Sequence, residues 1–364
     1  MTVVLAAGDE FVRTDLLTAA LRERLEGAGP AGRDGADQDG AGRESERSLE
    51  IRELHLEWPT RAWGDVAEVS EAAGDEETVI GALSGVDVAV THLAPFTERV
   101  FAAAPGLRLV VVSRGGPVNV NLDAATRAGV PVCYAPGRNA NAAAEFTIGL
   151  MLATCRNIAA GHAALRAGHW PGYYFRYDSA GFELEDATVG LVGYGAIGHR
   201  VGRLLTAFGA TVLAYDPHAP AEAFDRAVER VDTLEDLLTR SRLVSLHARL
   251  TPETRGLIGA REIGLMPRGA VLVNTARGGL LDYDALCDAL DDGHLAAAGL
   301  DVYEQEPLPP DSRLLRTPNV VTAPHIAGCS REVAWRAARI CADEVARFVE
   351  GLPPAHCANP EVLG

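Results

Sequence analysis

Short apolar segments alternate with helix-like stretches along most of this 364-residue chain. Those of strand length are TVVLAAG, DVAVTHL, LRLVVVS, TVGLVGYG, TVLAYD, LVSLHA, AVLVNTA, AAGLDV and NVVTAPH. Continuous apolar strands separated by helices are typical of parallel sheets that helices cover on both faces. The strands are more numerous than one small sheet usually contains. The pattern therefore predicts an α/β protein with two doubly wound, Rossmann-like or flavodoxin-like domains.

Composition and charge exclude several classes of function. The formal net charge of −17 argues against non-specific binding to nucleic acid. All 33 basic residues are arginine, so a Schiff-base lysine and the lysine of a phosphate-binding P-loop are excluded. No apolar run reaches the roughly 18 residues of a membrane helix, and the N-terminus lacks a signal-peptide pattern, so we expect a cytoplasmic protein. The cysteines lack CxxC spacing and no HExxH motif occurs, so we predict reduced thiols and no metal site.

Two segments differ from this alternation. Residues 27–48 are rich in glycine and charge and contain no large apolar residue, so we interpret them as a disordered insertion in the first domain. From Asn141, the sequence NAAAEFTIGLMLATCRNIAAGHAALRAG predicts a long helix or a helix pair with Asn141 as its N-cap. Its first half is apolar nearly all round, so we expect burial, either as a connection between domains, across a dimer, or both.

The strongest local motif is a glycine loop. In TVGLVGYGAIGHRVGRLLTAFGATVLAYD, a strand runs into Gly193, Gly195 and Gly198, a helix follows, and a second strand ends at Asp216. Gly193 permits a tight turn, Gly195 lets the backbone approach a pyrophosphate, and Gly198 lets helix and strand pack closely. A bare GxGxxG is a weak signal, but here each flanking element is in the required place. Because Asp216 would bind the ribose hydroxyls and repel a 2′-phosphate, the motif predicts NAD rather than NADP, and the neighbouring His218 weakens this only slightly.

His325 ends the last apolar segment, and a lone histidine there is uninformative. Four further blocks, however, occur in a fixed order: HARLTPETRGLIG, MPRGAVLVNTARGGLLDYDAL, GLDVYEQEPLP and TAPHIAG. With these blocks, residues from about 50 to 360 resemble the D-isomer-specific 2-hydroxyacid dehydrogenase family, the relatives of phosphoglycerate, glyoxylate and hydroxypyruvate reductases. The resemblance implies an NAD-dependent enzyme that interconverts a D-2-hydroxy acid and its 2-oxo acid, and a homodimer formed through the nucleotide-binding domains.

The resemblance implies three catalytic residues. Arg277 in NTARGG would hold and polarise the 2-oxo carboxylate, Glu306 in YEQEP would be the carboxylate partner of the histidine, and His325 would be the acid–base. Elementary chemistry agrees, because ketone reduction needs a proton for the oxygen as hydride reaches the carbon, and imidazole titrates in the useful range. A neighbouring carboxylate favours the protonated imidazole, and a guanidinium grips a carboxylate at two points.

Further positions follow from the resemblance. The cofactor positions outside the glycine triplet and Asp216 are Ala196, Ile197, Thr275, Ala276, Asp301 and Gly328. The first-domain loop whose backbone amides would receive the substrate carboxylate comprises Arg114, Gly115 and Gly116. Arg114, Arg138 and Arg249 could also provide a cation for a second anionic group such as a phosphate, although ordinary solvated arginines are equally plausible. The sequence names neither the 2-hydroxy acid nor the direction of the reaction.

We expect a discontinuous substrate domain of residues 1–137 plus 327–364 and an NAD-binding domain of residues 138–326, with a cleft between them that closes on substrate. Two rivals remain. A dinucleotide-sensing corepressor of the same family would retain all three catalytic residues, and steady-state turnover would separate it from an enzyme. Formate dehydrogenase resembles the family but surrounds its acid–base differently, and the YEQEP block argues against it.

Overall fold

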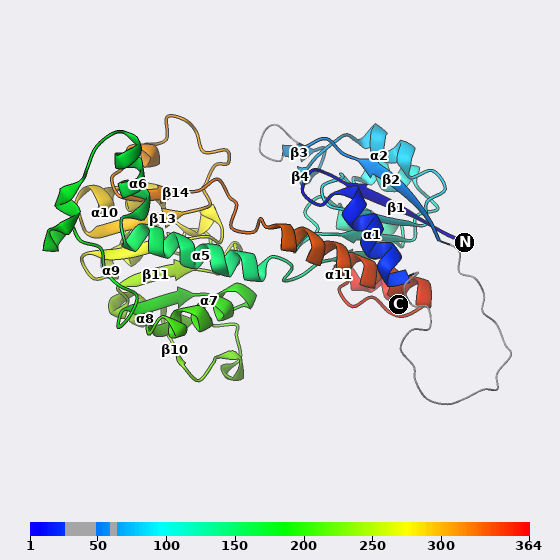
Figure 1. Cartoon of the computed structure of the whole chain (residues 1–364). Coiled ribbons are helices and arrows are strands. Elements are labelled where there is room, and N and C mark those ends of the chain that lie inside the picture. The colour runs from blue at the N-terminus through cyan, green and yellow to red at the C-terminus, as the bar shows by residue number, and fades with distance from the viewer. Residues whose placement is uncertain (26–48, 59–63) are drawn as a thin grey trace, which may run out of the picture. The chain divides into compact units, whose positions relative to one another are not determined.

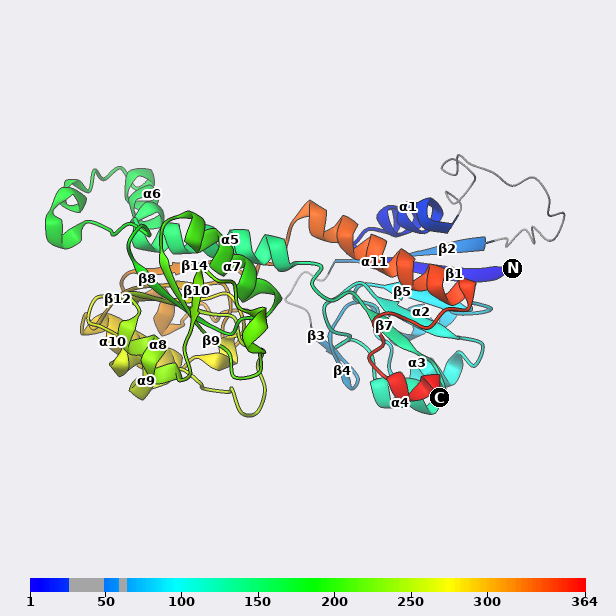
Figure 2. The same ribbon diagram turned by 90° about the horizontal axis from the view of Figure 1, so that it is seen from below.

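The computed structural model describes residues 1–25, 49–58 and 64–364. The predicted insertion at residues 27–48 lies outside the described residues. The chain forms two compact units, Met1–Arg138 with Ser330–Gly364 and Asn139–Cys329, shown in Figures 1 and 2. The division runs close to the boundaries expected from the sequence, and the assignment of substrate binding to the first unit stays a prediction.

The first unit contains a five-stranded parallel sheet with the strand order β2-β1-β5-β6-β7. Its strands are Leu49–His55, Thr2–Gly8, Val88–Thr91, Leu109–Val112 and Val132–Tyr134 in that order. Helices α1 (Thr14–Leu25) and α11 (Arg331–Glu350) lie side by side on one face, as Figure 1 shows. The other face packs against α2 (Glu76–Ala82), α3 (Glu98–Ala103) and α4 (Leu122–Arg127). The layered core buries apolar side chains on both faces of the sheet.

Two smaller features complete the first unit. A hairpin of β3 (Gly64–Val66) and β4 (Val69–Ala72) forms a separate antiparallel sheet. After α11, the chain is attached to the unit by the buried Glu344, whose carboxylate accepts the backbone N–H groups of Ala355 and His356, both at 3.0 Å. The first unit is therefore closed by residues from the end of the sequence.

The second unit contains a seven-stranded parallel sheet with the order β10-β9-β8-β11-β12-β13-β14. Its strands are Val228–Arg230, Thr211–Tyr215, Thr188–Val192, Leu243–Leu246, Ala270–Asn274, Leu295–Leu300 and Val320–Thr322 in that order. One face packs against α5 (Ala140–Cys155) and α7 (Ala196–Ala207), and the other against α8 (Leu234–Arg240), α9 (Ala260–Leu265) and α10 (Tyr283–Asp291). The prediction of two parallel, Rossmann-like sheets is confirmed.

The helix predicted from Asn141 is a helix pair, α5 followed by α6 (Ile158–Arg166). The two are separated at Asn157, whose backbone is left-handed with φ 56°. The prediction of Asn141 as N-cap was wrong, because α5 begins at Ala140 and Asn141 lies within its first turn, where its side chain accepts a hydrogen bond from Arg200 Nε at 2.6 Å. None of the helices in the described ranges is long and apolar enough to cross a bilayer.

Candidate active site

The predicted catalytic residues of the second unit lie at the carboxyl edge of its sheet. Strand β8 lies between β9 and β11, so the strand order reverses there, and doubly wound sheets bind ligands at such a switch point. Gly193 follows β8, Arg277 follows β12, Asp301 follows β13 and His325 follows β14. Because parallel strands end on the same side of the sheet, four segments distant in sequence come to one edge.

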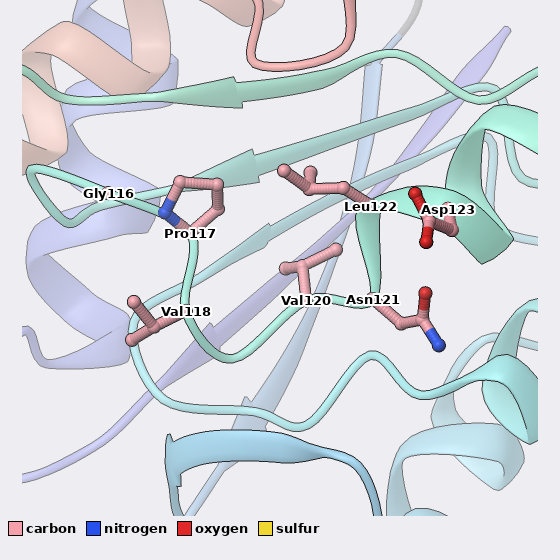
Figure 3. A pocket seen from close by; sticks show the side chains of 7 residues that line it. All are labelled: Gly116, Pro117, Val118, Val120, Asn121, Leu122 and Asp123. Atoms are coloured by element: carbon pink, nitrogen blue, oxygen red, sulfur yellow. The ribbon is translucent and has the colours of Figure 1, made fainter. Parts of the chain in front are cut away.

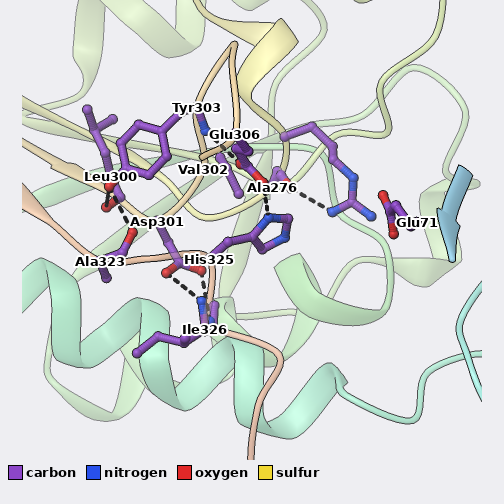
Figure 4. A network of polar contacts seen from close by, with 12 residues as sticks. Glu71, Ala276, Leu300, Asp301, Val302, Tyr303, Glu306, Ala323, His325 and Ile326 are labelled. Carbon is purple, nitrogen blue, oxygen red and sulfur yellow. Dashed lines mark hydrogen bonds and ion pairs between the residues drawn. The ribbon is translucent and has the colours of Figure 1, made fainter. Parts of the chain in front are cut away.

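His325 and Glu306 form a hydrogen-bonded pair, drawn in Figure 4. The distance from His325 Nδ1 to Glu306 Oε2 is 2.6 Å, and the side chains are 36% and 30% exposed. His325 also has a left-handed backbone with φ 55°, which costs a non-glycine residue free energy and is found preferentially at functional sites. With Nδ1 engaged by the carboxylate, Nε2 is the ring nitrogen that can exchange a proton with a ligand.

Glu306 is held in place and ionised by its surroundings. Its Oε1 accepts the backbone N–H of Tyr303 at 2.9 Å, while Oε2 binds His325. Partial burial raises the pKa of Glu306, but the hydrogen bond and charge of His325, the Tyr303 N–H and the charge of Arg277 outweigh it and leave the pKa below its ordinary value. The carboxylate is therefore ionised near neutral pH, and the exposed Arg277 lies near enough to act on it.

Residues that the sequence analysis did not identify hold the turns after β12, β13 and β14 against one another. A Cβ on Gly278 would lie 1.9 Å from the carbonyl oxygen of Tyr303, so only glycine permits the turn after β12 to approach the turn after β13. The Tyr303 hydroxyl donates to the carbonyl oxygen of Ala323 at 2.8 Å, and burial raises its pKa to about 12. Asn274 Oδ1 accepts the N–H of Ala276 at 3.0 Å. The motif NTARGG contained Asn274 and Gly278, but nothing in it indicated these contacts.

Asp301, expected to face the nicotinamide, positions the histidine loop. Its two carboxylate oxygens accept the backbone N–H groups of Ile326 and Ala327, both at 2.8 Å (Figure 4). Burial raises the pKa of Asp301, and these two hydrogen bonds and the charge of His325 oppose that increase only in part. The carboxyl group thus fixes the residues after His325, and a contact of Asp301 with the cofactor stays a prediction.

The glycine loop fits a dinucleotide pyrophosphate. Gly193 has φ 97°, and a Cβ on it would lie 2.6 Å from the backbone nitrogen of Ala248. A Cβ on Gly198 would lie 2.3 Å from the carbonyl oxygen of Gly193, so helix and turn are in contact there. Around Gly195, in contrast, no described atom lies within 4 Å of an added Cβ. Gly195 precedes Ala196 at the start of α7, where an approaching anion meets backbone N–H groups and the positive end of the helix dipole.

The remaining predicted cofactor positions follow strands of the same sheet or begin α7. Asp216 follows β9, and its Oδ2 accepts the N–H of Tyr194 at 2.8 Å, which ties the acid to the glycine loop. Ile197 lies in the first turn of α7, and Thr275 shares a hydrogen bond of 2.8 Å with Thr147 of α5.

The loop of Gly328, the last of these positions, approaches α5. A Cβ on Gly328 would lie 2.7 Å from Asn139 Nδ2, so a larger residue there would have to displace the Asn139 side chain. In the described ranges, no three His, Cys, Asp or Glu side chains form a metal-binding group.

In the first unit, the predicted substrate loop follows β6. Arg114 is buried and donates from Nη1 to the carbonyl oxygen of Glu71 at 2.9 Å and from Nη2 to the Glu71 carboxylate. Gly115 and Gly116 have open space on the side where a Cβ would be. A pocket of about 370 Å³ is lined by Gly116–Val118 and Val120–Asp123, as Figure 3 shows. Small residues and accessible backbone are what a loop needs if it binds a carboxylate through N–H groups.

Comparison with known proteins gives consistent results. The sequence profile described as D-isomer specific 2-hydroxyacid dehydrogenase, NAD binding domain, matches residues 148–327. The chain is 38% identical over 321 residues to a glyoxylate reductase of Korarchaeum cryptofilum, covering 87% of this chain and 94% of the relative. It is also 38% identical over 290 residues to D-3-phosphoglycerate dehydrogenase of Methanocaldococcus jannaschii, covering 79% of this chain. That match covers 54% of the relative, so the chain spans about half the length of the phosphoglycerate dehydrogenase.

Solved structures agree with this assignment. The TT0316 protein of Thermus thermophilus is 29% identical with a TM-score of 0.75, covering 98% of this chain and 100% of the other. D-2-hydroxyisocaproate dehydrogenase is 25% identical with a TM-score of 0.77, covering 99% and 100%. The family predicted from the motifs is confirmed, and with it an NAD-binding unit of the dehydrogenase type. The chain belongs to the D-isomer specific 2-hydroxyacid dehydrogenase family.

Proposed function

We propose that the protein interconverts a small D-2-hydroxy acid and its 2-oxo acid, with NAD as the hydride carrier and His325, Glu306 and Arg277 as the catalytic residues. The observation that carries this proposal is the 2.6 Å pair of His325 and Glu306 at the carboxyl edge of the NAD-binding sheet. A partly exposed imidazole with an ionised carboxylate behind it and a guanidinium nearby is suited to move one proton on an anionic substrate.

Each of the proposed catalytic residues has a separate role. NADH, held by the glycine loop and Asp216, would supply the hydride that the carbonyl carbon of the 2-oxo acid accepts in the reducing direction. His325 donates a proton from Nε2 to the carbonyl oxygen, because Nδ1 is held by Glu306. The Glu306 carboxylate stabilises the imidazolium before the transfer. Arg277 binds the substrate carboxylate through two N–H groups and fixes which carbonyl face is presented, and the amides of Arg114, Gly115 and Gly116 bind substrate from the first unit.

A substrate panel tests the proposal. Glyoxylate, hydroxypyruvate, pyruvate and phosphorylated 2-oxo acids are each mixed with NADH and the protein, and the loss of NADH absorbance is followed. We expect turnover with at least one of them and formation of the D-enantiomer of any chiral product. No turnover of any 2-oxo acid by a folded protein that binds NADH would contradict the proposed function.

Asp216 gives a second expectation, a strong preference for NAD(H) over NADP(H). The Asp216 carboxylate is fixed against the glycine loop by the Tyr194 N–H, so it cannot swing away from a 2′-phosphate without breaking that bond. The values of kcat/KM with NADH and NADPH are compared using one active 2-oxo acid. Equal values for the two cofactors would contradict this role of Asp216.

The two rival functions have less support. The relatives reported above are dehydrogenases and reductases, and nothing in the described part of the chain favours a corepressor. An NAD-dependent formate dehydrogenase of Staphylococcus aureus shares the fold, with a TM-score of 0.71 and 25% identity. The fold alone therefore does not separate these activities, and the carboxylate of Glu306 on His325 is what favours a 2-hydroxyacid dehydrogenase.

We further propose that the protein is a cytoplasmic homodimer formed through the second unit. Helix α6 contributes no buried residue, and the two short 3₁₀ turns after it, Gly172–Phe175 and Tyr177–Ser179, are equally open. Large apolar side chains are exposed along this segment, namely Ile158, Leu165, Trp170, Tyr173, Phe175 and Tyr177. Exposed apolar groups gathered in this way are typical of a protein interface, and the family resemblance indicates a second copy as the partner.

Light scattering after size-exclusion chromatography tests the dimer. We expect a mass of about twice 38.4 kDa for the wild type and a shift toward monomer for Phe175→Asp with Tyr177→Asp. Leu315→Asp changes an exposed leucine outside this segment and should leave the mass unaltered. A wild-type monomer at all concentrations would contradict the proposal.

A further inference from the structure

The substrate loop of the first unit contains an arginine whose charge is already compensated. We propose that Glu71 is a specificity-determining residue: by pairing with Arg114 it cancels the positive charge of the loop, so that the protein prefers 2-oxo acids with an uncharged side group over phosphorylated ones. This inference rests on the proposed function and narrows its substrate class.

The contact between Glu71 and Arg114 has two parts. Arg114 Nη1 donates to the backbone carbonyl oxygen of Glu71 at 2.9 Å, and Nη2 donates to its carboxylate. The Arg114 side chain is only 11% exposed, whereas that of Glu71 is 41% exposed. A mostly buried guanidinium with two acceptors on one residue is held in a fixed geometry. Moving it onto a ligand phosphate would leave the Glu71 carboxylate without its cation.

The backbone conformation of Glu71 indicates that its surroundings hold it against Arg114. Its φ is 50°, a left-handed conformation that is unfavourable for a non-glycine residue. Such a conformation persists only where the surroundings determine it. Here the carbonyl and the carboxylate of the same residue reach one guanidinium, which is a two-point contact that compensates for the cost.

The hairpin that carries Glu71 is also attached to the substrate loop. On β4, the Ser70 N–H donates to the carbonyl oxygen of Val118 at 3.1 Å. One residue before β4, Glu68 Oε1 accepts a hydrogen bond from Asn121 Nδ2 at 2.7 Å, and this bond is the largest of the contacts that lower the Glu68 pKa. Val118 and Asn121 both line the pocket at Gly116 (Figure 3). Glu71 therefore acts from a hairpin that already holds the loop at two other places.

The arginines around this loop are fully offset by nearby carboxylates. The guanidinium groups of Arg114 and Arg138 both act on the buried His92, so both lie near it. Asp9 is hydrogen-bonded to the same histidine at 2.7 Å, and Glu71 binds Arg114. Two cations thus meet these two carboxylates, and the acidic residues of the pocket lining and of the hairpin add further negative charge. A phosphate would gain no net attraction there and would still lose its hydration on binding, whereas a neutral hydroxyl or hydrogen has far less hydration to lose.

A matched pair of substrates and a matched pair of variants test the proposal. Hydroxypyruvate and its phosphate ester differ only in the charged group, and the ratio of their kcat/KM values measures the preference. We expect the wild type to favour hydroxypyruvate by at least about tenfold. Glu71→Gln keeps the shape and one acceptor oxygen but removes the charge, so it should move the ratio toward the phosphate ester by about tenfold. Glu50→Gln removes a carboxylate from the pair with Arg52 at 2.7 Å and should leave the ratio unchanged.

A double variant shows whether the effect passes through Arg114. In an Arg114→Gln background, Glu71→Gln should no longer change the ratio, because no guanidinium is released. Wild-type preference for the phosphate ester would overturn the inference while leaving the proposed function intact. An unchanged ratio in a folded Glu71→Gln variant that still reduces hydroxypyruvate would overturn it as well. Absence of turnover with every 2-oxo acid would refute the proposed function itself and the inference with it.

Discussion

Each unit of the molecule contains a histidine hydrogen-bonded through Nδ1 to a carboxylate, and the two pairs are almost identical in length. His325 and Glu306 in the second unit are 2.6 Å apart, and His92 and Asp9 in the first are 2.7 Å apart. The side chains of His325 and Glu306 are 36% and 30% exposed, whereas those of His92 and Asp9 are 1% and 0% exposed. The contact alone therefore does not distinguish a catalytic pair from a structural one.

The surroundings of the two pairs differ in kind. Asp9 Oδ1 accepts the backbone N–H groups of Phe11 and Val12 at 2.9 and 3.0 Å, so its carboxyl group organises the turn before α1. Burial lowers the pKa of His92, with further lowering by the charges of Arg138 and Arg114, and the contact with Asp9 offsets only part of this. His92 is thus a neutral, enclosed imidazole.

His325, in contrast, is reached by solvent and lies on a strained backbone at the carboxyl edge of a sheet that binds NAD. A proton donor must be both accessible and able to carry charge. Exposure and position relative to the strand ends therefore distinguish the proposed catalytic pair from the structural pair.

The largest expected effect is on turnover. His325→Asn should lower kcat by a factor of about 10² to 10⁴, the usual cost of losing a general acid–base, with little change in NADH affinity. His55→Asn provides the control, because His55 is exposed and lies 3.3 Å from Glu10 in the first unit, outside the proposed catalytic residues. Stopped-flow kinetics and NADH fluorescence titration measure the two quantities. A His325→Asn variant that turns over at the wild-type rate would remove His325 from the mechanism.

The second effect is on stability rather than on turnover. Asp9→Asn should destabilise the first unit by about 1–3 kcal/mol, because the buried pair loses its charge and one hydrogen bond is mismatched. A fall of several degrees in the thermal midpoint is expected for a unit of this size. The exposed Asp15, paired with Arg13, supplies Asp15→Asn as the control with no comparable loss. If Asp9→Asn left the midpoint unaltered, the structural role of this pair would be disproved.

The third effect is a smaller, pH-dependent loss of turnover. Glu306→Gln keeps a hydrogen-bonding side chain against Nδ1 of His325 but removes its negative charge, so kcat for reduction at neutral pH should fall by about tenfold, less than in His325→Asn. Because the pKa of Glu306 lies below its ordinary value, the wild type should lose this charge, and show the same fall in kcat, only in acid. A pH series of single-turnover rates compares the two proteins. Equal rates at neutral pH, with chemistry rate-limiting, would contradict the pairing.

The smallest effect concerns the pH dependence of stability. The pKa of His92 is lowered in the folded state, so the unfolded chain takes up its proton first, below about pH 6.5. The stability that His92 contributes is therefore fully present above that pH and is lost as the pH falls. The difference in thermal midpoint between wild type and His92→Gln should shrink from about pH 8 to about pH 5. A difference that grows on acidification would show that the histidine is charged in the fold.

Much of the fold followed from the sequence, because strands buried on both faces are continuously apolar. Each of the segments such as VVVS or TVLAY coincides with a strand of the two sheets. The missed strands lie mostly at sheet edges, where one side is solvated or the strand is short. LEIRELH, which forms β2, alternates apolar and charged residues, and β7 spans only Val132–Tyr134. The hairpin around Glu71 is polar and gave no signal.

The sequence suggested residues for the candidate site but not the contacts that support them. Motif order brought Arg277, Glu306 and His325 together because each block has a recognisable sequence. The locking contacts of Gly278 and Tyr303 depend on how closely two turns approach, which is a property of three-dimensional packing. Arg114 was predicted to bind substrate, but its pairing with Glu71 joins residues 43 positions apart, and no local pattern reveals such a partner.

Because α11 completes the first unit, the two units can finish folding only in a fixed order during translation. The second unit, residues 139–329, is continuous and can complete its core as soon as it has left the ribosome. The first unit is begun earlier but finished later, because Leu109 and Val111 of its sheet pack against a cluster that includes Ala338 and Val345 of α11. The part of the chain made first therefore waits for the part made last, with an apolar sheet face that α1 covers only in part.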